Sequence, residues 1–320
     1  MDFADLVDPE LRESLFRVPP GLDPAEDLEG TRRRMLERAP FAGSADQQAR
    51  VQRTDLTIPG PPDNADGVRV RVYEPRERAA EALPGLLWVH GGGFCGGAVD
   101  QDDGLCTSIV DEIGAVIVSV DYRLAPEHPF PAGPEDCYAA LRWLFDTAHE
   151  RGVTRSRIGV AGYSSGAGFA AALALMARDR GECELAFQVL LCPLLDVPHR
   201  ASSRAIVDPR VRNQPTTDSS WRLYLGDAYD APPAYAAPAR AADLSGLPPA
   251  YLAVSQFDVN CEEDIEYARR LLGAGVATEL HVFPRGFHGF ELLVPDAQIS
   301  RDAVADRTRA LRRALHPSGE

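Results

Sequence analysis

The sequence predicts an α/β protein, in which helices cover both faces of a mostly parallel sheet. Short, continuous apolar runs such as Leu86–Val89 and Ile158–Ala161 are typical of strands buried on both sides, and helical patterns separate these runs along the chain. Polar residues lie at the carboxyl ends of several of the expected strands, among them His90, Ser164 and Asp258. Because ligands bind at the carboxyl ends of parallel strands, we expect the functional site at this edge of the sheet.

The composition of the chain argues against some classes of binding partner. The chain has 320 residues, of which 45% are hydrophobic and 25% charged, and its formal net charge is −15. An acidic surface repels nucleic acid and anionic membranes, so we expect neither as a main partner. No apolar run is long enough to insert across a membrane, and the amino terminus lacks the apolar core of a signal peptide. Because the six scattered cysteines also form no Cys-x-x-Cys pair, we expect a cytoplasmic protein with reduced thiols.

The first 48 residues differ from those that follow. Two helical patterns, about Phe3 to Phe16 and about Pro24 to Arg38, flank the turn signal Pro19–Gly21. The basic run Arg32–Arg34 lies opposite several acids, and charge runs of this kind usually face water. We therefore expect two helices here, with the basic run on a solvated face.

Strand patterns begin at residue 51. Alternation over Val51–Ile58 and Val68–Tyr73 predicts an antiparallel entry to the sheet. The proline-rich segment 121–131 does not fit a helix. Further strands are expected at Leu86–Val89, Ala115–Val120, Ile158–Ala161, Phe187–Leu191, Ala250–Val254 and Thr278–Phe283.

Helical patterns lie between these strands. The pattern over residues 137–148 has a single apolar stripe, whereas the run after Ser164 is apolar almost all round and predicts the most buried helix of the fold. A later helix is expected to bury Ile265, Ala268 and Leu272 on one face, and a terminal helix follows the last strand.

The alternation lapses between Pro193 and Leu247, where the sequence is polar and proline-rich with one helical pattern about Thr217 to Leu225. This segment leaves and rejoins the sheet at strand ends, so we expect it to form a lid together with the amino-terminal helices. The expected organisation is cap helices in 1–48, a sheet domain in 49–196 and 242–320, and a cap insertion in 197–241.

The pentapeptide Gly162–Gly166 is typical of a nucleophile elbow with Ser164 at its tip. A strand that turns at once into a helix strains the central residue, and the flanking glycines remove Cβ atoms that would collide. The pentapeptide alone arises by chance in about one chain in ten of this size. A serine hydroxyl also needs a base, so we expect His288 to take the proton of Ser164 and Asp258 to orient the imidazole.

Alternatives for the acid stay open in the sequence. Asp258 is also placed to cap the following helix, and Glu262 or Glu263 competes for its role. The two glutamates fall in the first helical turn, where they interact with the helix dipole, so Asp258 is favoured.

The glycine-rich loop His90–Phe94 fits either an anion-binding loop or a flexible turn. A phosphate loop of the Walker type is excluded, because the Gly-Lys-Ser/Thr ending is missing. With a nucleophile nearby, the amides of Gly92, Gly93 and Ser165 are the expected donors to a tetrahedral oxyanion, each worth about 3–4 kcal/mol in the transition state. We expect no metal site.

With these motifs in place, the chain resembles the bacterial hormone-sensitive lipase family, the family IV carboxylesterases, and the order Ser164, Asp258, His288 is that of an α/β hydrolase. The blocks that carry the resemblance are His90–Phe94, Asp121–Pro131, the elbow, Leu247–Ala250 leading to Asp258, and Phe287–Phe290. The resemblance implies an eight-stranded α/β-hydrolase domain, a helical cap and ester hydrolysis without a cofactor. A homodimer is a candidate state by analogy alone.

The chain departs from the family at the elbow and in the acid loop. Tyr163 stands where the family commonly has aspartate, and Val259–Glu263 replaces the common Pro-Leu-Arg-Asp-Glu. Aromatic residues next to the expected catalytic positions are candidates to line the substrate pocket, and Trp221 in the insertion joins them. These candidates are Phe94, Tyr163, Phe257, Phe287 and Trp221.

The leading hypothesis is a serine carboxylesterase that hydrolyses small to medium, fairly apolar small-molecule esters through an acyl-enzyme intermediate. One alternative keeps the machinery and changes the bond, as in an amide deacylase or lactonase of a biosynthetic pathway. Another is a non-catalytic ligand-binding protein on the same fold, which the intact set of Ser164, Asp258 and His288 disfavours.

Overall fold

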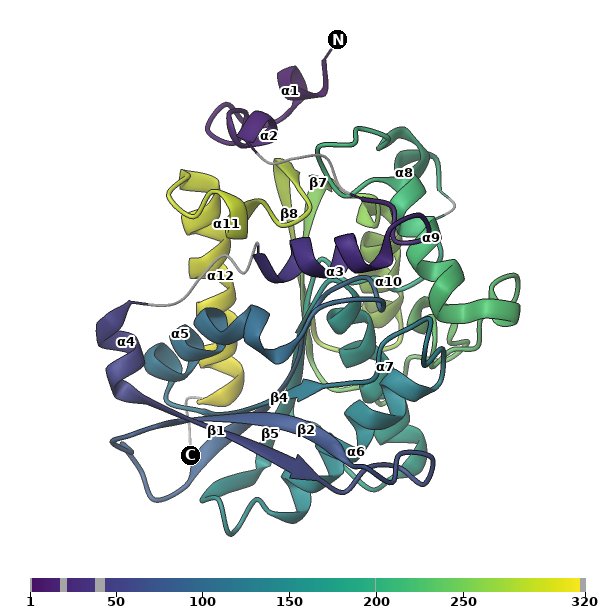
Figure 1. Ribbon diagram of the computed structural model, residues 1–320. Coiled ribbons are helices and arrows are strands. Elements are labelled where there is room, and N and C mark those ends of the chain that lie inside the picture. The colour runs from purple at the N-terminus through teal and green to yellow at the C-terminus, as the bar shows by residue number, and fades with distance from the viewer. Residues whose placement is uncertain (1, 18–21, 38–43, 199, 317–320) are drawn as a thin grey trace.

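The computed structural model, which describes residues 2–17, 22–37, 44–198 and 200–316, contains an eight-stranded sheet with the order β1-β2-β4-β3-β5-β6-β7-β8 (Figure 1). The strands are β1 (Val51–Ile58), β2 (Val68–Pro75), β3 (Leu83–Val89), β4 (Val116–Asp121), β5 (Val153–Tyr163), β6 (Gln188–Leu191), β7 (Ala250–Phe257) and β8 (Thr278–Phe287). β2 pairs antiparallel with β1 and β4, and all other pairs are parallel. The predicted α/β class with a mostly parallel sheet is confirmed.

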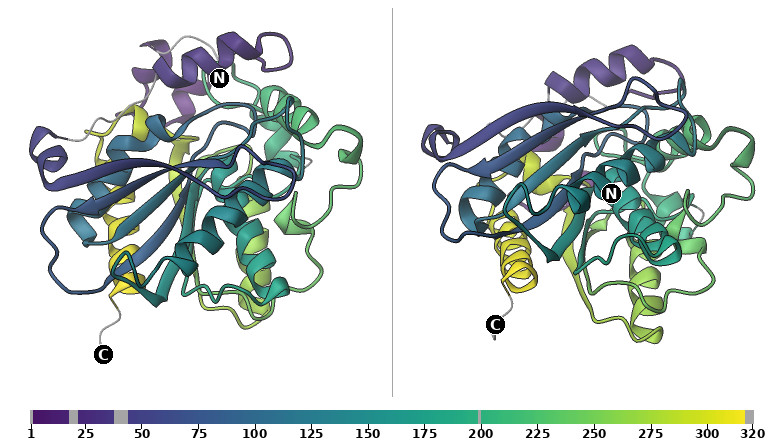
Figure 2. Two further views of the ribbon diagram at one scale, coloured as in Figure 1. Left: turned by 60° about the horizontal axis from the view of Figure 1, so that its bottom comes forward. Right: turned by 90° about the horizontal axis from the view of Figure 1, so that it is seen from below.

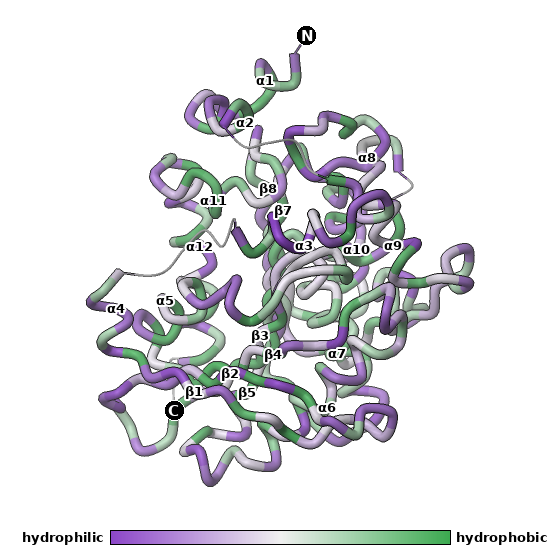
Figure 3. The backbone as a smooth tube through the Cα atoms, in the orientation of Figure 1, coloured by the Kyte–Doolittle hydropathy of each residue, from purple (hydrophilic) through white to green (hydrophobic). Residues whose placement is uncertain are grey.

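Helices cover both faces of the sheet (Figure 2). On one face α5 (Asp103–Ile113) packs on β2 and β4, and α12 (Gln298–Leu315) packs on β5, β7 and β8. The other face carries α6 (Ala132–Asp146), α7 (Ser165–Arg180) and α10 (Cys261–Gly273). Every residue of β3 is buried between these layers, as continuous apolar strands require, and Figure 3 shows the hydrophobic central strands.

Two of the helix predictions have different outcomes. α7 is buried from Ser165 to Ala177, as its apolar run indicates. α10 instead buries Tyr267, Ala268 and Leu271, while Ile265 and Leu272 are 39% and 58% exposed. The buried face of α10 contains Tyr267 and its i+4 neighbour Leu271. The prediction was therefore wrong, because the face that it placed in the core is rotated by a fraction of a helical turn from the buried one.

The amino-terminal segment contains α1 (Phe3–Leu6), α2 (Ser14–Arg17), α3 (Leu28–Glu37) and α4 (Ala45–Arg50). The helix expected over Phe3–Phe16 is therefore two short helices joined by turns, and α3 begins four residues after Pro24. The turn signal Pro19–Gly21 and Arg38 lie outside the described residues.

Arg32 departs from the expected solvated face. Its Nε donates to the carbonyl of Cys95 at 2.7 Å, Nη2 donates to the carbonyl of Ala125 at 3.0 Å, and both Nη atoms bind the carboxylate of Glu127. This ion pair lowers the pKa of Glu127 to about 2. Arg32 thus connects α3 to Cys95, at the end of the glycine-rich loop, and to the segment Ala125–Glu127.

The insertion after β6 contains α8 (Ala201–Ala205) and α9 (Gln214–Leu225), and α11 (Phe290–Leu293) follows β8. Asn213 caps α9 by accepting from the amide of Thr216 at 3.1 Å. Figure 1 shows α3 between α11 and α9. The hydroxyl of Ser219 in α9 donates a hydrogen bond of 3.0 Å to the carboxylate of Asp23, which joins the insertion to the amino-terminal segment. No helix in the described part of the chain has the length and apolar character needed to cross a membrane.

Candidate active site

Ser164 occupies a sharp turn between β5, which ends at Tyr163, and α7, which begins at Ser165. Its backbone has φ 56° and ψ −122°, a strained conformation for a residue with a side chain. A Cβ atom at Gly166 would overlap the carbonyl oxygens of Val89 and His90, so only glycine allows α7 to start this close to β3. The turn therefore holds the Ser164 side chain at the end of the sheet.

A hydrogen-bonded chain links Ser164, His288 and Asp258. The Oγ of Ser164 lies 3.0 Å from Nε2 of His288, and Nδ1 of His288 lies 2.6 Å from Oδ2 of Asp258. Asp258 is fully buried at the end of β7, and its Oδ1 accepts from the amide of Asn260 at 3.1 Å. With Nδ1–H donating to the carboxylate, Nε2 is left to accept the serine proton.

The competing acids lie elsewhere. Glu262 is exposed on α10, and the buried carboxylate of Glu263 accepts a hydrogen bond from Ser203 at 3.2 Å. Asp258 is therefore the carboxylate that the structure brings to His288.

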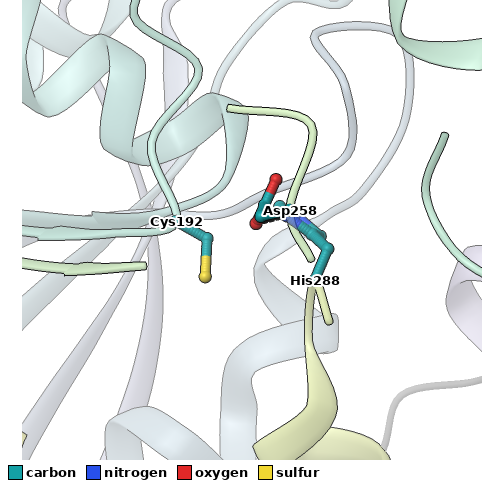
Figure 4. A group of neighbouring side chains, drawn as sticks. All are labelled: Cys192, Asp258 and His288. Carbon is teal, nitrogen blue, oxygen red and sulfur yellow. Dashed lines mark hydrogen bonds and ion pairs between the residues drawn. The ribbon is translucent and has the colours of Figure 1, made fainter. Parts of the chain in front are cut away.

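Cys192, at the end of β6, is a further neighbour of the pair. Figure 4 shows its thiol beside Asp258 and His288, and one ligand atom from each of the three lies within 4.8 Å of the others. Burial raises the pKa of Cys192 well above its ordinary value, which keeps the thiol protonated. Since Asp258 and His288 bind each other, we assign no metal to this group.

The glycine-rich loop lies against the elbow. Gly92 has φ 141°, and its carbonyl accepts from the amide of Gly96 at 3.0 Å, which closes a tight turn. Within the described residues the amides of Gly92 and Gly93 donate to no protein group. The rings of Tyr122 and His90 stack with 4.3 Å between their centroids, and the Tyr122 hydroxyl donates a hydrogen bond to the carbonyl of His90. These two contacts hold the start of the loop in place. The loop thus offers free N–H donors next to Ser164.

Ser164 and His288 open into a cavity of about 270 Å³ that is also lined by Gly91 and Gly92. Its wall comes from α3, the glycine-rich loop, the segment before α9, and α11. Apolar side chains make up much of this wall, among them Leu22, Met35, Leu105, Phe287, Leu292 and Leu293.

The aromatic candidates separate into two groups. Tyr163 and Phe287 line the cavity. Phe94 is buried instead against Tyr224, 4.2 Å between ring centroids, and Trp221, 4.7 Å. Phe257 packs on Phe3 at 5.7 Å. These three expected pocket residues lie outside the described cavity wall, because the apolar side of α9 and the amino terminus use them for packing.

Tyr163 joins the elbow to the segment that follows His288. Its hydroxyl donates to Oε1 of Glu291 at 2.9 Å, and its ring meets the His288 ring edge-on at 6.0 Å. The other carboxylate oxygen of Glu291 is buried and has no partner among the described residues. Burial raises the pKa of Tyr163 well above its ordinary value, so the hydroxyl stays a donor.

We expect Tyr163→Phe to lower the free energy of unfolding by about 1–3 kcal/mol, because it leaves the partly buried carboxylate of Glu291 without its donor. Urea unfolding of Tyr163→Phe, Glu291→Met and the double variant completes a double-mutant cycle. The double variant should be more stable than the sum of the single effects, since neither polar group is then left unpaired. Strictly additive effects would show that the bond contributes nothing to stability.

Sequence reasoning missed polar residues of the cavity wall, notably Asp102 and Arg212. Asp102 is 6% exposed and accepts from Nε1 of Trp88 at 2.6 Å, and burial raises its pKa to about 6. Neither residue lies in a motif, and each reaches the cavity through a loop or helix start whose position depends on distant segments. Only the tertiary structure brings them to Ser164.

The raised pKa of Asp102 predicts a pH-dependent stability. The folded protein holds this proton up to about pH 6, whereas an unfolded chain releases it near the ordinary value of 3.8. The contribution of this bound proton to the free energy of unfolding is therefore present below about pH 4 and is lost as the pH rises to 6. We expect Asp102→Asn to remove this loss and raise stability at pH 8 by about 2–3 kcal/mol. Urea midpoints at pH 4 and pH 8 measure the effect, and an equal gain at both would contradict it.

The chain is similar to known esterases over almost its full length. A family model described as "alpha/beta hydrolase fold" matches residues 86–292. Esterase LipI of Mycobacterium tuberculosis is 37% identical, over 98% of this chain and 97% of that protein, and Carboxylesterase NlhH of the same organism is 36% identical over 97% of each. The solved structure titled "Bacterial Heroin Esterase" has a TM-score of 0.92 at 40% identity and covers 98% of this chain and 100% of its own.

Proposed function

Because this chain belongs to the hormone-sensitive lipase-like α/β hydrolases and is, like its relatives, a carboxylic ester hydrolase, we propose that Ser164, His288 and Asp258 are its catalytic triad. The observation that carries the proposal is the pair of hydrogen bonds that joins Ser164 to His288 and His288 to Asp258. Distances of 3.0 Å and 2.6 Å join the three side chains at the edge of an apolar cavity.

Each step of the reaction has a residue to perform it. The Oγ of Ser164 attacks the ester carbonyl carbon while Nε2 of His288 takes the hydroxyl proton. The amides of Gly92, Gly93 and Ser165 receive the negative charge that forms on the carbonyl oxygen. His288 then passes its proton to the leaving alcohol, which produces an acyl-enzyme.

Hydrolysis of the acyl-enzyme repeats these roles with water. His288 removes a proton from water as it attacks the acyl carbon, and then returns that proton to Ser164 as the carboxylic acid leaves. Throughout, Asp258 keeps Nδ1 of His288 protonated and the ring in position. The protein's own residues therefore suffice for the complete cycle.

The cavity sets the size of the substrate. A volume of about 270 Å³ with a largely apolar wall suits small to medium, fairly apolar carboxylic esters. We assign residues 1–48 and 197–241 to a cap, because α3 and the segment before α9 both contribute to the wall. The homodimeric state and the cytoplasmic location stay predictions.

Active-site labelling tests the proposal. An alkyl 4-nitrophenyl phosphonate should release one equivalent of 4-nitrophenol and leave its phosphonyl group on the peptide that contains Ser164. Ser119→Ala, which changes a buried serine of β4 away from the cavity, should be labelled equally. Labelling of another residue, or none in an active preparation, would overturn the assignment.

Tyr163, where the elbow departs from the family, is the feature that would favour amide or lactone hydrolysis over ester hydrolysis. Its hydroxyl is bound to Glu291, so it adds no group that acts on a leaving amine. Ester hydrolysis is accordingly favoured, and kcat/KM for a matched ester and anilide should be larger for the ester.

A further inference from the structure

Arg212 reaches the candidate active site from the segment just before α9. It lines the same cavity as Ser164. A Cβ atom built on Gly93 would lie 3.3 Å from Nη1 and 3.4 Å from Nη2 of Arg212, so the guanidinium lies over the backbone of the glycine-rich loop. This places a positive group beside the amides that are proposed to bind the oxyanion.

No protein group accepts a hydrogen bond from Arg212 within the described part of the chain. Its Nε and Nη2 atoms are buried and lack partners. Arg71 and Arg123, which are also largely buried, are bound to Asp55 and Asp136, whereas Arg307 shares with Arg212 a buried Nε that has no partner among the described residues. Burial lowers the pKa of Arg212 and the charge of Asp258 opposes that shift, and a guanidinium keeps its charge in proteins. Leaving such a charge desolvated and unpaired is costly, which indicates that a ligand completes the site.

Among the charged side chains of the cavity wall, Arg212 is the candidate to bind an anion. Arg34, Arg210 and Arg212 line the cavity, whereas Asp102 is the carboxylate among the described wall residues. Arg210 is already bound by Asp208 and Asp2, and Asp102 accepts from Trp88. The negative charge of Asp258 also acts on Arg212 from behind the wall. Arg212 lines the space beside Ser164, and its Nε and Nη2 atoms have no hydrogen-bond partner among the described residues.

We propose that Arg212 binds a carboxylate carried by the ester substrate, so that the enzyme prefers esters bearing a second, ionised carboxyl group. This inference rests on the proposed function. The planar guanidinium fork matches a carboxylate through two parallel N–H···O bonds, which an apolar wall cannot offer. The carboxylate belongs either to the acyl part of the ester or to the alcohol part.

Two substrate pairs distinguish these positions. For the acyl part, mono-4-nitrophenyl adipate is compared with 4-nitrophenyl 6-methylheptanoate, in which an isopropyl group replaces the carboxylate. For the alcohol part, 4-acetoxybenzoate is compared with 4-acetoxybenzamide. We expect kcat/KM to be higher for the charged member of one pair, and that pair identifies the part of the substrate that Arg212 contacts.

Variants of Arg212 then test its role. Arg212→Met should lower kcat/KM for the favoured charged ester by about 10- to 100-fold, mainly through KM, and change the neutral partner by less than about threefold. Arg212→Lys should retain part of the preference, because it keeps the charge and loses the fork. Arg222→Met, which alters an exposed arginine on the following helix α9, is the matched control and should leave both rates unchanged.

The outcomes separate the inference from the proposed function. Hydrolysis of the neutral esters with no preference for a charged one overturns the role of Arg212 and leaves the esterase intact. An equal loss for charged and neutral esters in Arg212→Met also overturns it, since the guanidinium would then act on the oxyanion common to all esters. Hydrolysis of none of the four compounds contradicts the proposed function itself. If Arg212→Met does not fold, as judged by circular dichroism, the charged-to-neutral ratio of Arg212→Lys decides, and an unchanged ratio overturns the proposal.

Discussion

Ser164→Ala is expected to lower kcat for 4-nitrophenyl esters by about 10⁴- to 10⁶-fold. Alanine leaves His288 without a hydroxyl to activate, so no acyl-enzyme forms, and the rate that persists comes from the oxyanion-binding amides and from substrate binding. The measurement is the steady-state release of 4-nitrophenol, together with the loss of the pre-steady-state burst that an accumulating acyl-enzyme gives.

Two controls keep this result interpretable. Ser119→Ala removes a buried serine hydroxyl within β4 and should retain wild-type kcat. The thermal transition of Ser164→Ala should lie close to that of the wild type, because the strained backbone turn is unchanged. Ester hydrolysis by a folded Ser164→Ala variant at the wild-type rate would show that the nucleophile is another group.

Asp258→Asn has the second-largest expected effect, a loss of about 10³- to 10⁴-fold in kcat. An amide NH₂ group in place of Oδ2 would face Nδ1 of His288, which now donates across 2.6 Å. The imidazole would then place its proton on Nε2 and lose the lone pair that accepts from Ser164.

Comparison with the neighbouring acid makes this test specific. Glu262→Gln changes an exposed carboxylate on α10 and should retain wild-type kcat. The KM of Asp258→Asn should change little, because the buried carboxylate does not reach the substrate. Similar losses in the two variants would point to a general effect of charge near α10 rather than to the orientation of His288.

Local signals in the sequence were enough to predict the fold class and the three hydrogen-bonded residues Ser164, His288 and Asp258. Each buried strand is a short apolar run, and the polar residue after it lies at the carboxyl end by the geometry of a parallel sheet. That rule alone places Ser164 and Asp258 at one edge of the sheet, and the loop after β8 adds His288.

Features that depend on distant partners were not visible in the sequence. Arg32 looked like part of a solvated run because its partner Glu127 is 95 residues away. Phe94 was expected in the pocket because it adjoins the glycine-rich loop, and Trp221 because it lies in the insertion, but neither position shows that the two rings pack on each other. Arg212 carried no signal, since its place over Gly93 is set by how the segment before α9 packs on the loop.

The structure also separates the parts of the molecule that are open to evolutionary change from those that are not. Met35, Val211 and Leu292 line the cavity from segments outside the sheet, whereas Ser164 and Asp258 follow directly on the strands β5 and β7. Substitutions in the outer segments alter the shape of the cavity without disturbing strand pairing. A mutant library confined to these three positions should therefore yield a high proportion of folded, active variants with new substrate ranges.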